Sequence, residues 1–253
     1  KGMSMKQTIL ITGGTGKFGR AFIGHFINKG WQVIFTSTQQ HRIDCLKRDV
    51  ASKSLEGICA DFTSQNSVNE LLEKLGNLGY RVNHLVNNAR SLQFLRTNNK
   101  GQTSRDDFIG EYLLDVVVPY ELSVGLFNAQ ANDLKTITNI GSQYGLVASN
   151  PNLYEQGMVS PIQYGTAKAA LQHLTKELAV RFAKQNVRVN CVAYGGVEGR
   201  VDDGFKKRYS KLTPTERMLR DSELAGPLEN LINDSCSAIT GHTLVADGGW
   251  SLW

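Results

Sequence analysis

The amino-acid sequence predicts an α/β fold: a single doubly wound domain with a parallel sheet of about seven strands flanked by helices. Three observations lead to this prediction. Short apolar runs alternate with amphipathic segments, a glycine cluster follows the first apolar run, and 253 residues with 41% hydrophobic content can bury one core. Because no repeat, low-complexity tract or linker interrupts the alternation, we expect residues 1–253 to form one domain.

The first half of the chain is predicted to alternate strands with helices. The run QTILIT has the apolar centre of a buried strand, whereas Phe22, Ile23, Phe26 and Ile27 recur at helical spacing before Gly30. Short apolar runs give the next strands, and leucines on one face give the next helix. We predict strands at 7–12, 32–35, 55–59 and 84–86, and helices at 20–29 and 68–75.

The second half continues the same alternation. It is predicted to contain a helix at 108–127, a strand at 134–140, a helix at 163–183, and strands at 187–192 and 243–246. Strands that alternate with helices need crossover connections. Such connections place parallel strands in one sheet that helices cover on both faces.

Cysteine and histidine give no sign of a metal site or a redox motif. The cysteines form no C-x-x-C pair, and the histidines form no pair with the i, i+4 spacing of metal ligands. We therefore expect no bound metal. We also expect the thiols to be buried and reduced, at Cys45, Cys59, Cys191 and Cys236.

The net charge of +5 arises from 28 basic and 23 acidic residues that are dispersed along the chain. Dispersed charge is typical of solvated faces and of an anionic cofactor, so we expect no nucleic-acid partner. No apolar run reaches the roughly 18 residues of a membrane helix, which predicts a cytoplasmic protein without membrane contact. Because Lys1 precedes the first Met, we expect Lys1 and Gly2 to be left from an expression tag, with the native start at Met3 or Met5.

A glycine-rich loop joins the first predicted strand to the first predicted helix. Glycines allow a tight turn and a close approach of the backbone to a pyrophosphate, which the free N–H groups at the start of the helix hold. A plain tight turn is the alternative, but the flanking strand and helix are the context of a Rossmann-type dinucleotide site. The loop residues are Thr12, Gly13, Gly14, Thr15, Gly16, Lys17, Phe18 and Gly19.

The residues after the second predicted strand bear on the choice of dinucleotide. The stretch from Thr36 to Arg42 contains no carboxylate. A carboxylate there usually binds the ribose hydroxyls of NAD, whereas neutral and basic residues leave room for the 2′-phosphate of NADP. The hydroxyls of Ser37 and Thr38 can bond that phosphate and Lys17 or Arg42 can neutralise it, so we expect NADP in preference to NAD. Both cations can equally be ordinary surface charges.

Several further motifs follow in order. They are Asp61-Phe62 in CADFT, Asn87-Asn88-Ala89, Asn139-Ile140-Gly141-Ser142, Tyr164-Gly165-Thr166-Ala167-Lys168, Arg188-Val189-Asn190, and an ending from Ile239 to Trp250. Together with the glycine loop, they resemble the short-chain dehydrogenase/reductase family from the first predicted strand to the last residues. The resemblance implies an enzyme that transfers a hydride between NAD(P) and a carbonyl or alcohol carbon.

Tyr164 and Lys168 have the spacing that this chemistry needs. Residues four apart share one face of a helix, so the ammonium can lie beside the phenol and stabilise the phenolate. Tyr164 can then give a proton to a carbonyl oxygen or take one from an alcohol. Ser142 is expected to hold the same oxygen by a hydrogen bond. The resemblance adds that Lys168 bonds the nicotinamide ribose.

The resemblance also implies cofactor-binding positions and a homo-oligomer, either a tetramer or a dimer. Some positions have structural alternatives: Asp61 can cap a helix or start a turn, and Asn88 and Asn190 can tie strands to loops. The cluster 206–208 can be a solvated helix face or a clamp for a phosphorylated substrate. The implied positions are Gly13, Thr15, Gly16, Lys17, Phe18, Gly19, Ser37, Thr38, Asp61, Phe62, Asn88, Ala89, Tyr164, Lys168, Gly195 and Val197.

Four residues depart from the family's pattern. Lys17 occupies the position of the loop's usual middle glycine, with Gly16 beside it. Asp115 stands where the family has an asparagine of the proton relay, and it can hold a water or raise the pKa of Lys168. Arg90 replaces the glycine after Asn-Asn-Ala, and Tyr194 replaces a proline before Gly195. The bulk of these two side chains can reshape the nicotinamide pocket or indicate reduced activity.

Two segments bear on the substrate. The loop 149–161 lengthens the connection between Ser142 and Tyr164, and its polar groups suit a hydroxyl-rich substrate. With the Trp-bearing end, it looks similar to dehydrogenases associated with flagellin modification and surface-polysaccharide sugar synthesis. The segment 195–220 is expected to be a mobile lid. The polar and aromatic groups of the loop are Asn150, Asn152, Tyr154, Glu155 and Gln156.

The leading functional hypothesis is an oxidoreductase that acts on a small-molecule carbonyl or secondary alcohol, on a sugar or sugar phosphate. A 3-oxoacyl-thioester reductase is the enzymatic alternative. An alternative of another class is a nucleotide-binding sensor or scaffold that has lost turnover, which Asp115, Arg90 and Tyr194 motivate.

Overall fold

The computed structural model describes residues 6–155, 159–199 and 201–253. The expected tag remnant Lys1–Gly2, both candidate start methionines and Gln156 therefore lie outside the described residues. Within them, no helix is both long and apolar enough to cross a bilayer. The same residues contain no cluster of His, Cys, Asp or Glu that could hold a metal ion.

A seven-stranded parallel sheet forms the centre of the molecule, as predicted. The strands are β1 (Thr8–Ile11), β2 (Gln32–Ser37), β3 (Leu55–Cys59), β4 (His84–Asn87), β5 (Thr136–Ser142), β6 (Arg188–Tyr194) and β7 (Thr243–Ala246). Their order across the sheet is β3-β2-β1-β4-β5-β6-β7. From β1 the strand order runs outward through β2 to β3, and then returns to β4 on the other side of β1. A doubly wound fold binds its ligand where the strand order reverses in this way, outside the carboxyl ends of β1 and β4.

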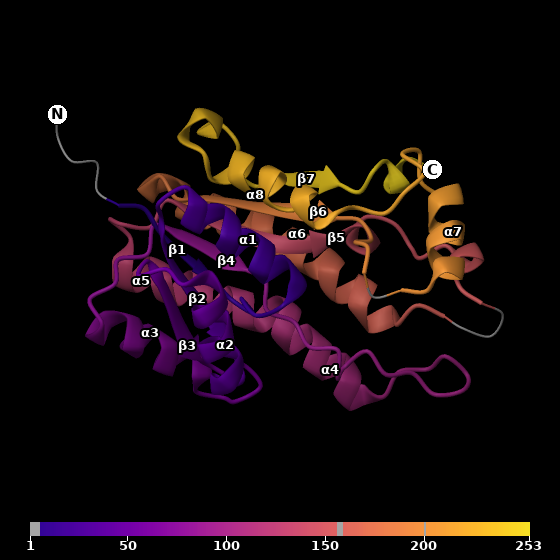
Figure 1. Cartoon of the computed structure of the whole chain (residues 1–253), viewed down its shortest axis with the longest axis horizontal. Helices are drawn as coiled ribbons and strands as arrows, with labels where there is room; N and C mark the ends of the chain where they lie inside the picture. Colours follow the sequence, from indigo (N-terminus) through magenta and orange to yellow (C-terminus); the bar gives the residue numbers. More distant parts are fainter. Residues whose placement is uncertain (1–5, 156–158, 200) are drawn as a thin grey trace.

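Helices cover both faces of the sheet (Figure 1). They are α1 (Lys17–Asn28), α2 (Gln40–Val50), α3 (Ser67–Asn77), α4 (Arg105–Tyr112), α5 (Val118–Gln130), α6 (Ile162–Phe182), α7 (Asp203–Lys211) and α8 (Ala225–Ile232). Helices α2 and α8 were not predicted from the sequence, and α7 was anticipated only as a possible helix face at 206–208. In α2 only Ile43 and Leu46 are buried, so its apolar periodicity is too weak to stand out among charged neighbours.

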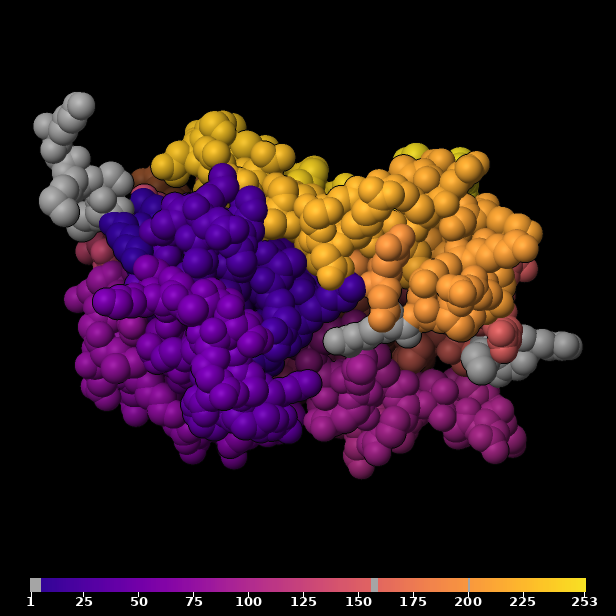
Figure 2. All heavy atoms as spheres, viewed as in Figure 1, coloured from indigo at the N-terminus to yellow at the C-terminus, as the bar shows by residue number. Residues whose placement is uncertain are grey.

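Two apolar layers hold the sheet between its helices. On one face Leu10, Leu85 and Ile137 pack in a cluster with apolar residues of α3, α5 and α6. On the other face Ile9 and Ile11 pack in a cluster with residues of α1, α2 and α8. Successive side chains of a strand point to opposite faces of the sheet, so β1 contributes apolar side chains to both layers. This explains why its sequence is continuously apolar. On the side of the molecule seen in Figure 2, the indigo and purple N-terminal part of the chain meets the orange and yellow C-terminal part.

The predicted helix at 108–127 is one run of three pieces. A π-helical turn, Leu113–Val117, separates α4 from α5. Pro119 follows the turn and has no N–H to donate to the carbonyl four residues earlier, that of Asp115, so the backbone widens there. The widened turn carries the side chain of Asp115, which is buried.

The cysteines differ from expectation. Only Cys191 is buried, whereas Cys59 is exposed and Cys45 and Cys236 are half-buried. Cys59 ends β3 at the edge of the sheet, where no neighbouring strand covers it.

His84 ties the start of β4 to its neighbours. Its Nδ1 lies 2.8 Å from Thr136 Oγ1, its Nε2 lies 3.1 Å from Gln7 Oε1, and its ring stacks on Trp31. Burial, with the positive charges of Lys135 and Arg188, lowers the pKa of His84 to about 3. The unfolded chain therefore binds a proton more readily than the folded one.

This difference predicts a stability that depends on pH. The contribution of neutral His84 is fully present above its unfolded pKa of about 6.5 and is lost as the pH falls toward 3. We expect the wild type to lose about 3 kcal/mol more unfolding free energy between pH 7 and pH 4.5 than His84→Gln, which does not titrate. Urea unfolding at both pH values measures this, and equal losses in the two proteins would contradict it.

Candidate active site

A cleft opens at the carboxyl ends of β1 and β4. There the glycine loop after β1 lies against the chain after β4: Gly13 has a φ of +67°, and a Cβ on it would come within 2.8 Å of Ala89 Cα. Asn88 Nδ2 donates to the carbonyls of Thr12, at 2.8 Å, and Gly13, at 3.2 Å. Asn88 thus has the structural role that the sequence left open, and it also lines the cleft.

The start of α1 fits a dinucleotide pyrophosphate. Gly16 caps the helix without a side-chain hydrogen bond, and the first turn holds no acidic residue. A Cβ on Gly19 would come within 2.6 Å of Gly13 O, so the loop and the helix can pack this closely only with glycine at position 19. The N–H groups of the first turn are left to bind an anion at the positive end of the helix.

The far end of the cleft has the character expected for a phosphorylated ribose. The whole cleft has a volume of about 470 Å³. Its far end is lined by Thr36, Ser37, Thr38 and Arg42. Among the described residues that line this cleft, no side chain is a carboxylate and two are arginines. Lys17, the other expected cation, lies elsewhere: it forms an ion pair with Asp221 at 2.8 Å and lines a second cavity.

Asp61 and Phe62 lie beside this end of the cleft. Both line a small adjoining cavity of about 210 Å³, and Phe62 also lines the cleft itself. The carboxylate of Asp61 accepts hydrogen bonds from Thr63 N, at 3.0 Å, and Thr63 Oγ1, at 2.7 Å. Asp61 therefore starts a turn, which was its structural alternative, at the edge of the cleft.

Ser142 and Tyr164 line one cavity of about 320 Å³. Ser142 ends β5 and is buried, while Tyr164 lies in the first turn of α6 and is half-buried. Phe18 and Arg90 line both this cavity and the cleft, so the two spaces adjoin. We refer to the cavity at Tyr164 as the substrate cavity. Gly195 and Val197 also line it, but they do not line the cleft.

Lys168 is buried next to Tyr164. Its Nζ lies 5.7 Å from the centre of the Tyr164 ring and donates to Asp115 Oδ1, at 2.9 Å, and Ile140 O, at 3.0 Å. Burial by itself would lower the pKa of Lys168, but the negative charge of Asp115, followed by that of Tyr164, raises it. The ammonium is therefore charged at neutral pH. Asp115 contacts it directly, so the residue that departs from the family's pattern belongs to the site.

Glu111, one helical turn before Asp115, was not predicted to belong to the site. Glu111 is 1% exposed, and neither of its carboxylate oxygens has a hydrogen-bond partner among the described residues. Burial, followed by the charge of Asp115, raises the pKa of Glu111 to about 7. The i, i+4 spacing of the two acids was visible in the sequence, but nothing there indicated that both are buried.

The other two departures leave the substrate cavity open. The guanidinium of Arg90 lies over the Tyr164 ring, 4.8 Å from its centre, in a cation–π arrangement. Tyr194 is buried, its ring packs edge-on against Phe18 at 5.0 Å, and its hydroxyl donates to Leu224 O. Tyr194 therefore forms part of the wall of the cavity, and its hydroxyl is occupied elsewhere.

The long loop before Tyr164 does not present the polar face that we expected. Asn150 caps a short 3-10 helix by accepting from Asn152 N, and Glu155 pairs with Arg208. Of the described polar groups in this loop, only Tyr154 lines the substrate cavity, and its hydroxyl lies 3.1 Å from that of Tyr144. Asn150 and Glu155 are therefore engaged in contacts within the protein and do not line the substrate cavity.

The described residues of the segment 195–220, which are 195–199 and 201–220, contribute one wall of the substrate cavity, in part through α7. Tyr209 stacks on Trp250, with ring centres 4.5 Å apart, and donates to Gln143 Oε1. Within the cluster 206–208, Arg208 Nε donates to Leu153 O, so Arg208 braces the loop. The mobility of this segment stays a prediction.

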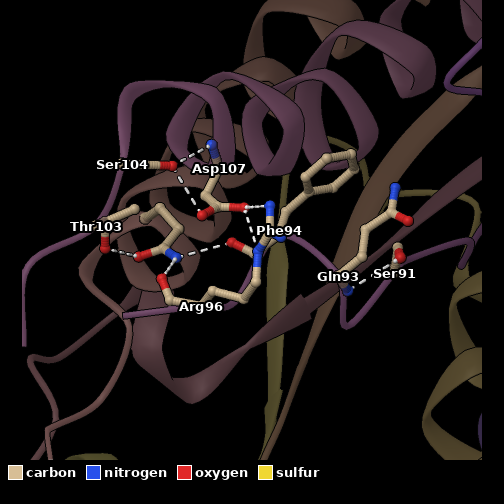
Figure 3. A network of polar contacts seen from close by, with 8 residues as sticks. Ser91, Gln93, Phe94, Arg96, Thr103, Ser104 and Asp107 are labelled. Atoms are coloured by element: carbon tan, nitrogen blue, oxygen red, sulfur yellow. Dashed lines mark hydrogen bonds and ion pairs between the residues drawn. The ribbon is translucent and has the colours of Figure 1, made fainter. Parts of the chain in front are cut away.

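A polar network fixes the start of α6 (Figure 3). Ser104 caps α4 by accepting from Asp107 N, and Arg96 Nη2 donates to Asp107 Oδ1 at 2.7 Å. The bond from Arg96, followed by the bond that Ser104 Oγ donates to Asp107 Oδ2 at 2.8 Å, lowers the pKa of the Asp107 carboxyl group. Buried Gln163 accepts from Thr103 Oγ1 and donates to the backbone of the segment before α4. The residue before Tyr164 is thus held from two sides, which fixes where the phenol enters the cavity.

Comparison with known proteins finds relatives over nearly the whole chain. The family model described as enoyl-(acyl carrier protein) reductase matches residues 17–251. The 3-oxoacyl-[acyl-carrier-protein] reductase FabG of Aquifex aeolicus is 29% identical, with 95% of each chain covered. The post-translational flagellin modification protein A of Campylobacter coli is 26% identical, with 99% of this chain and all of the relative covered.

Solved structures of short-chain dehydrogenases superpose on nearly the whole chain. A short-chain dehydrogenase from Leptospira borgpetersenii with bound NAD+ superposes with a TM-score of 0.88 at 27% identity, covering 97% of this chain and 93% of that one. The structure of ElxO with NADP bound superposes with a TM-score of 0.86 at 26% identity, covering 98% of this chain and all of that one. With the family model matching most of its length, and with the fold and motif order in agreement, this chain belongs to the short-chain dehydrogenase/reductase family of oxidoreductases.

Proposed function

We propose that this chain is an NADP(H)-dependent oxidoreductase that interconverts a carbonyl and a secondary alcohol on a small molecule bound at Tyr164. One observation carries the proposal: Ser142 and Tyr164 line a single cavity, Lys168 lies beside the phenol ring, and this cavity adjoins the glycine-loop cleft. The glycine loop, the uncapped helix start and the basic far end of the cleft suit a dinucleotide phosphate.

A bound nicotinamide would supply or accept the hydride. During reduction Tyr164 gives its phenolic proton to the carbonyl oxygen, and during oxidation it takes the proton of the alcohol. The ammonium of Lys168 stabilises the phenolate that results, because unlike charges attract strongly where water is excluded. Ser142 Oγ holds the reacting oxygen and stabilises the charge that develops on it. Asp115 in turn holds Lys168 in place.

We propose NADP as the preferred dinucleotide because Arg42 and hydroxyl side chains line the far end of the cleft. Arg42→Ala is expected to weaken NADPH binding about tenfold and to leave NADH binding unchanged, since an exposed charge-assisted hydrogen bond to phosphate contributes roughly 1.5 kcal/mol. Fluorescence titration with both dinucleotides measures this. Arg48→Ala, at an exposed arginine of α2 that does not line the cleft, is the matched control. An equal loss for NADPH and NADH would contradict the assignment.

The leading substrate class is a sugar or a sugar phosphate. Aromatic rings of Tyr144, Tyr154 and Phe205 line the cavity, and such rings stack on the apolar faces of sugars. Lys17 and Arg90 also line the cavity and can attract an anionic group. The full-length likeness to a flagellin modification protein is consistent with this class.

The second candidate substrate is a 3-oxoacyl thioester. The hydroxyls of Tyr194 and Tyr209 are bonded within the protein, which leaves a largely apolar cavity, and a 3-oxoacyl reductase is among the relatives. Steady-state assays with NADPH distinguish the two candidates. A higher kcat/KM for keto-sugar phosphates than for an acetoacetyl thioester is expected, and the reverse order would favour the thioester.

A sensor or scaffold without turnover is the alternative of another class. It requires that the dinucleotide binds while no carbonyl substrate is reduced. The contacts of Asp115 and Tyr194 do not support it, because the first holds Lys168 and the second leaves the cavity open. Dinucleotide binding without turnover on the full substrate panel would support it.

We also propose a homo-oligomer in the cytoplasm. Large apolar side chains are exposed on neighbouring helices, and a second copy of the chain could cover them. Light scattering after size-exclusion chromatography measures the assembly, and a monomer at micromolar concentration would contradict the proposal. The exposed side chains are Phe108, Ile109 and Tyr112 on α4, Tyr120 on α5 and Val180 on α6.

A further inference from the structure

We propose that Glu111 is a positioning residue for the reaction: its carboxyl group keeps a proton, donates it to Asp115 in a hydrogen bond, and so leaves the charge of Lys168 directed at Tyr164. The inference rests on the proposed function and deepens it. It assigns a role to a buried acid that the mechanism above does not use.

Two acids are buried here, and the one cation in the described part of the chain that donates to them, Lys168, reaches only Asp115. Asp115 is 2% exposed, and Lys168 Nζ satisfies only its Oδ1. Asp115 Oδ2 and both oxygens of Glu111 have no partner among the described residues. An ionised buried carboxylate without donors is costly, and two of them side by side more so. One proton on Glu111 supplies a donor for the open oxygen of Asp115.

The helix brings the two acids together. Glu111 lies near the end of α4, and Asp115 lies in the π-helical turn Leu113–Val117 that continues it. Residues four apart share one face of a helix, so the two side chains lie on the same side. Burial, followed by the charge of nearby Asp115, favours the protonated form of Glu111, and a proton on Glu111 can then bridge the two carboxyl groups. Helix α4 and the π turn pack against α6, which carries Tyr164 and Lys168.

The charges that face Glu111 come from three elements. They are Asp115 on its own helical run, Lys168 on α6, and Arg90 in the chain after β4. Burial and Asp115 raise the pKa of Glu111, Arg90 and Lys168 oppose them, and the resulting pKa is about 7. Arg90 is exposed, so solvent screens its effect. Glu111 therefore exchanges its proton near neutral pH.

The protonation state of Glu111 changes what Tyr164 experiences. While Glu111 is protonated, its hydrogen bond withdraws negative charge from Asp115, and the ammonium of Lys168 acts more fully on the phenolate. When Glu111 ionises, a second negative charge beside Lys168 opposes the phenolate. Alcohol oxidation, in which Tyr164 must accept a proton, is therefore weakened above neutral pH.

The first test compares pH–rate profiles for alcohol oxidation. Glu111→Gln keeps an N–H donor toward Asp115 but cannot ionise. We expect it to move the midpoint of the rising limb down by about one pH unit, because a unit charge a few ångströms away shifts a titration by that order. Glu111→Leu removes the donor, and we expect about a tenfold lower kcat throughout. Glu121→Gln, an exposed acid on α5, is the control and should match the wild type.

The second test needs no substrate. The pKa of Glu111 in the folded chain is raised from 4.5 to about 7, so its contribution to stability is full below 4.5 and is lost as the pH rises to 7. We expect the Tm of Glu111→Gln to gain about 5 °C on that of the wild type between pH 5 and pH 8. Glu121→Gln should gain nothing.

The outcomes separate the two proposals. A Tm difference that does not change with pH would overturn the shared proton, whether or not any substrate turns over. A pH-dependent Tm difference with superimposable pH–rate profiles would overturn the link to Tyr164. A wild type without turnover would refute the proposed function alone, because the Tm measurement still tests the proton that Glu111 holds.

Discussion

Replacing Tyr164 by phenylalanine is expected to lower kcat about 1,000-fold for carbonyl reduction, while the dinucleotide Kd changes less than about threefold. The substitution removes one hydroxyl from a side chain that lines the substrate cavity beside Ser142. General acid–base catalysis contributes about 10² to 10⁴ in rate. The other hydroxyl on this face of α6, that of Thr175, lies two turns after Lys168 and donates to Leu171 O. Stopped-flow and steady-state measurements with NADPH and a keto substrate give the value.

The control for this prediction is Tyr112→Phe. Tyr112 lies on α4, is exposed and does not line the substrate cavity, so the same chemical change there should leave kcat within about twofold. A Tyr164→Phe protein with wild-type turnover would show that the proton reaches the substrate by another group. The whole assignment of the cavity would then be wrong.

The sheet could be predicted from the sequence because each strand is a short apolar run that can be recognised without its neighbours. All seven predicted strands exist, and 55–59 and 243–246 have the predicted bounds. Buried strands of a parallel sheet are apolar on both faces, so a short run such as that of β1 is legible without knowledge of its neighbours. Helix α2 was missed for the opposite reason, since its contribution to the core is two side chains.

The residues of the candidate site could be predicted from the sequence where their chemistry depends on spacing along the chain. Tyr164 and Lys168 lie on one helix, and the glycine loop is a contiguous stretch. Roles that depend on distant contacts were not legible. Nothing in the sequence placed Lys17 beside Asp221, or paired Glu155 of the long loop with Arg208 of α7. Glu111 was missed because its burial follows from the packing of α4 against α6.

Lys168→Met is expected to abolish turnover and to lower the free energy of unfolding by about 3–5 kcal/mol. The substitution leaves Asp115 buried without its counter-ion, and breaking a buried ion pair from one side has a cost of that size. The pKa of Lys168 is raised in the folded chain, so the ammonium stabilises the fold at every pH below about 10 and is lost only as the pH rises beyond that value. Urea unfolding at pH 7.5 measures the loss.

The double variant Lys168→Met, Asp115→Leu separates stability from catalysis. Replacing both members of a buried ion pair by apolar residues of similar volume is often neutral, so most of the lost unfolding free energy should return. Turnover should not return, because no ammonium remains to stabilise the phenolate of Tyr164. If the double variant recovered activity together with stability, Lys168 would be a structural partner of Asp115 alone. If it recovered neither, the loss in the single variant would come from packing around α6 instead of from an unpaired carboxylate.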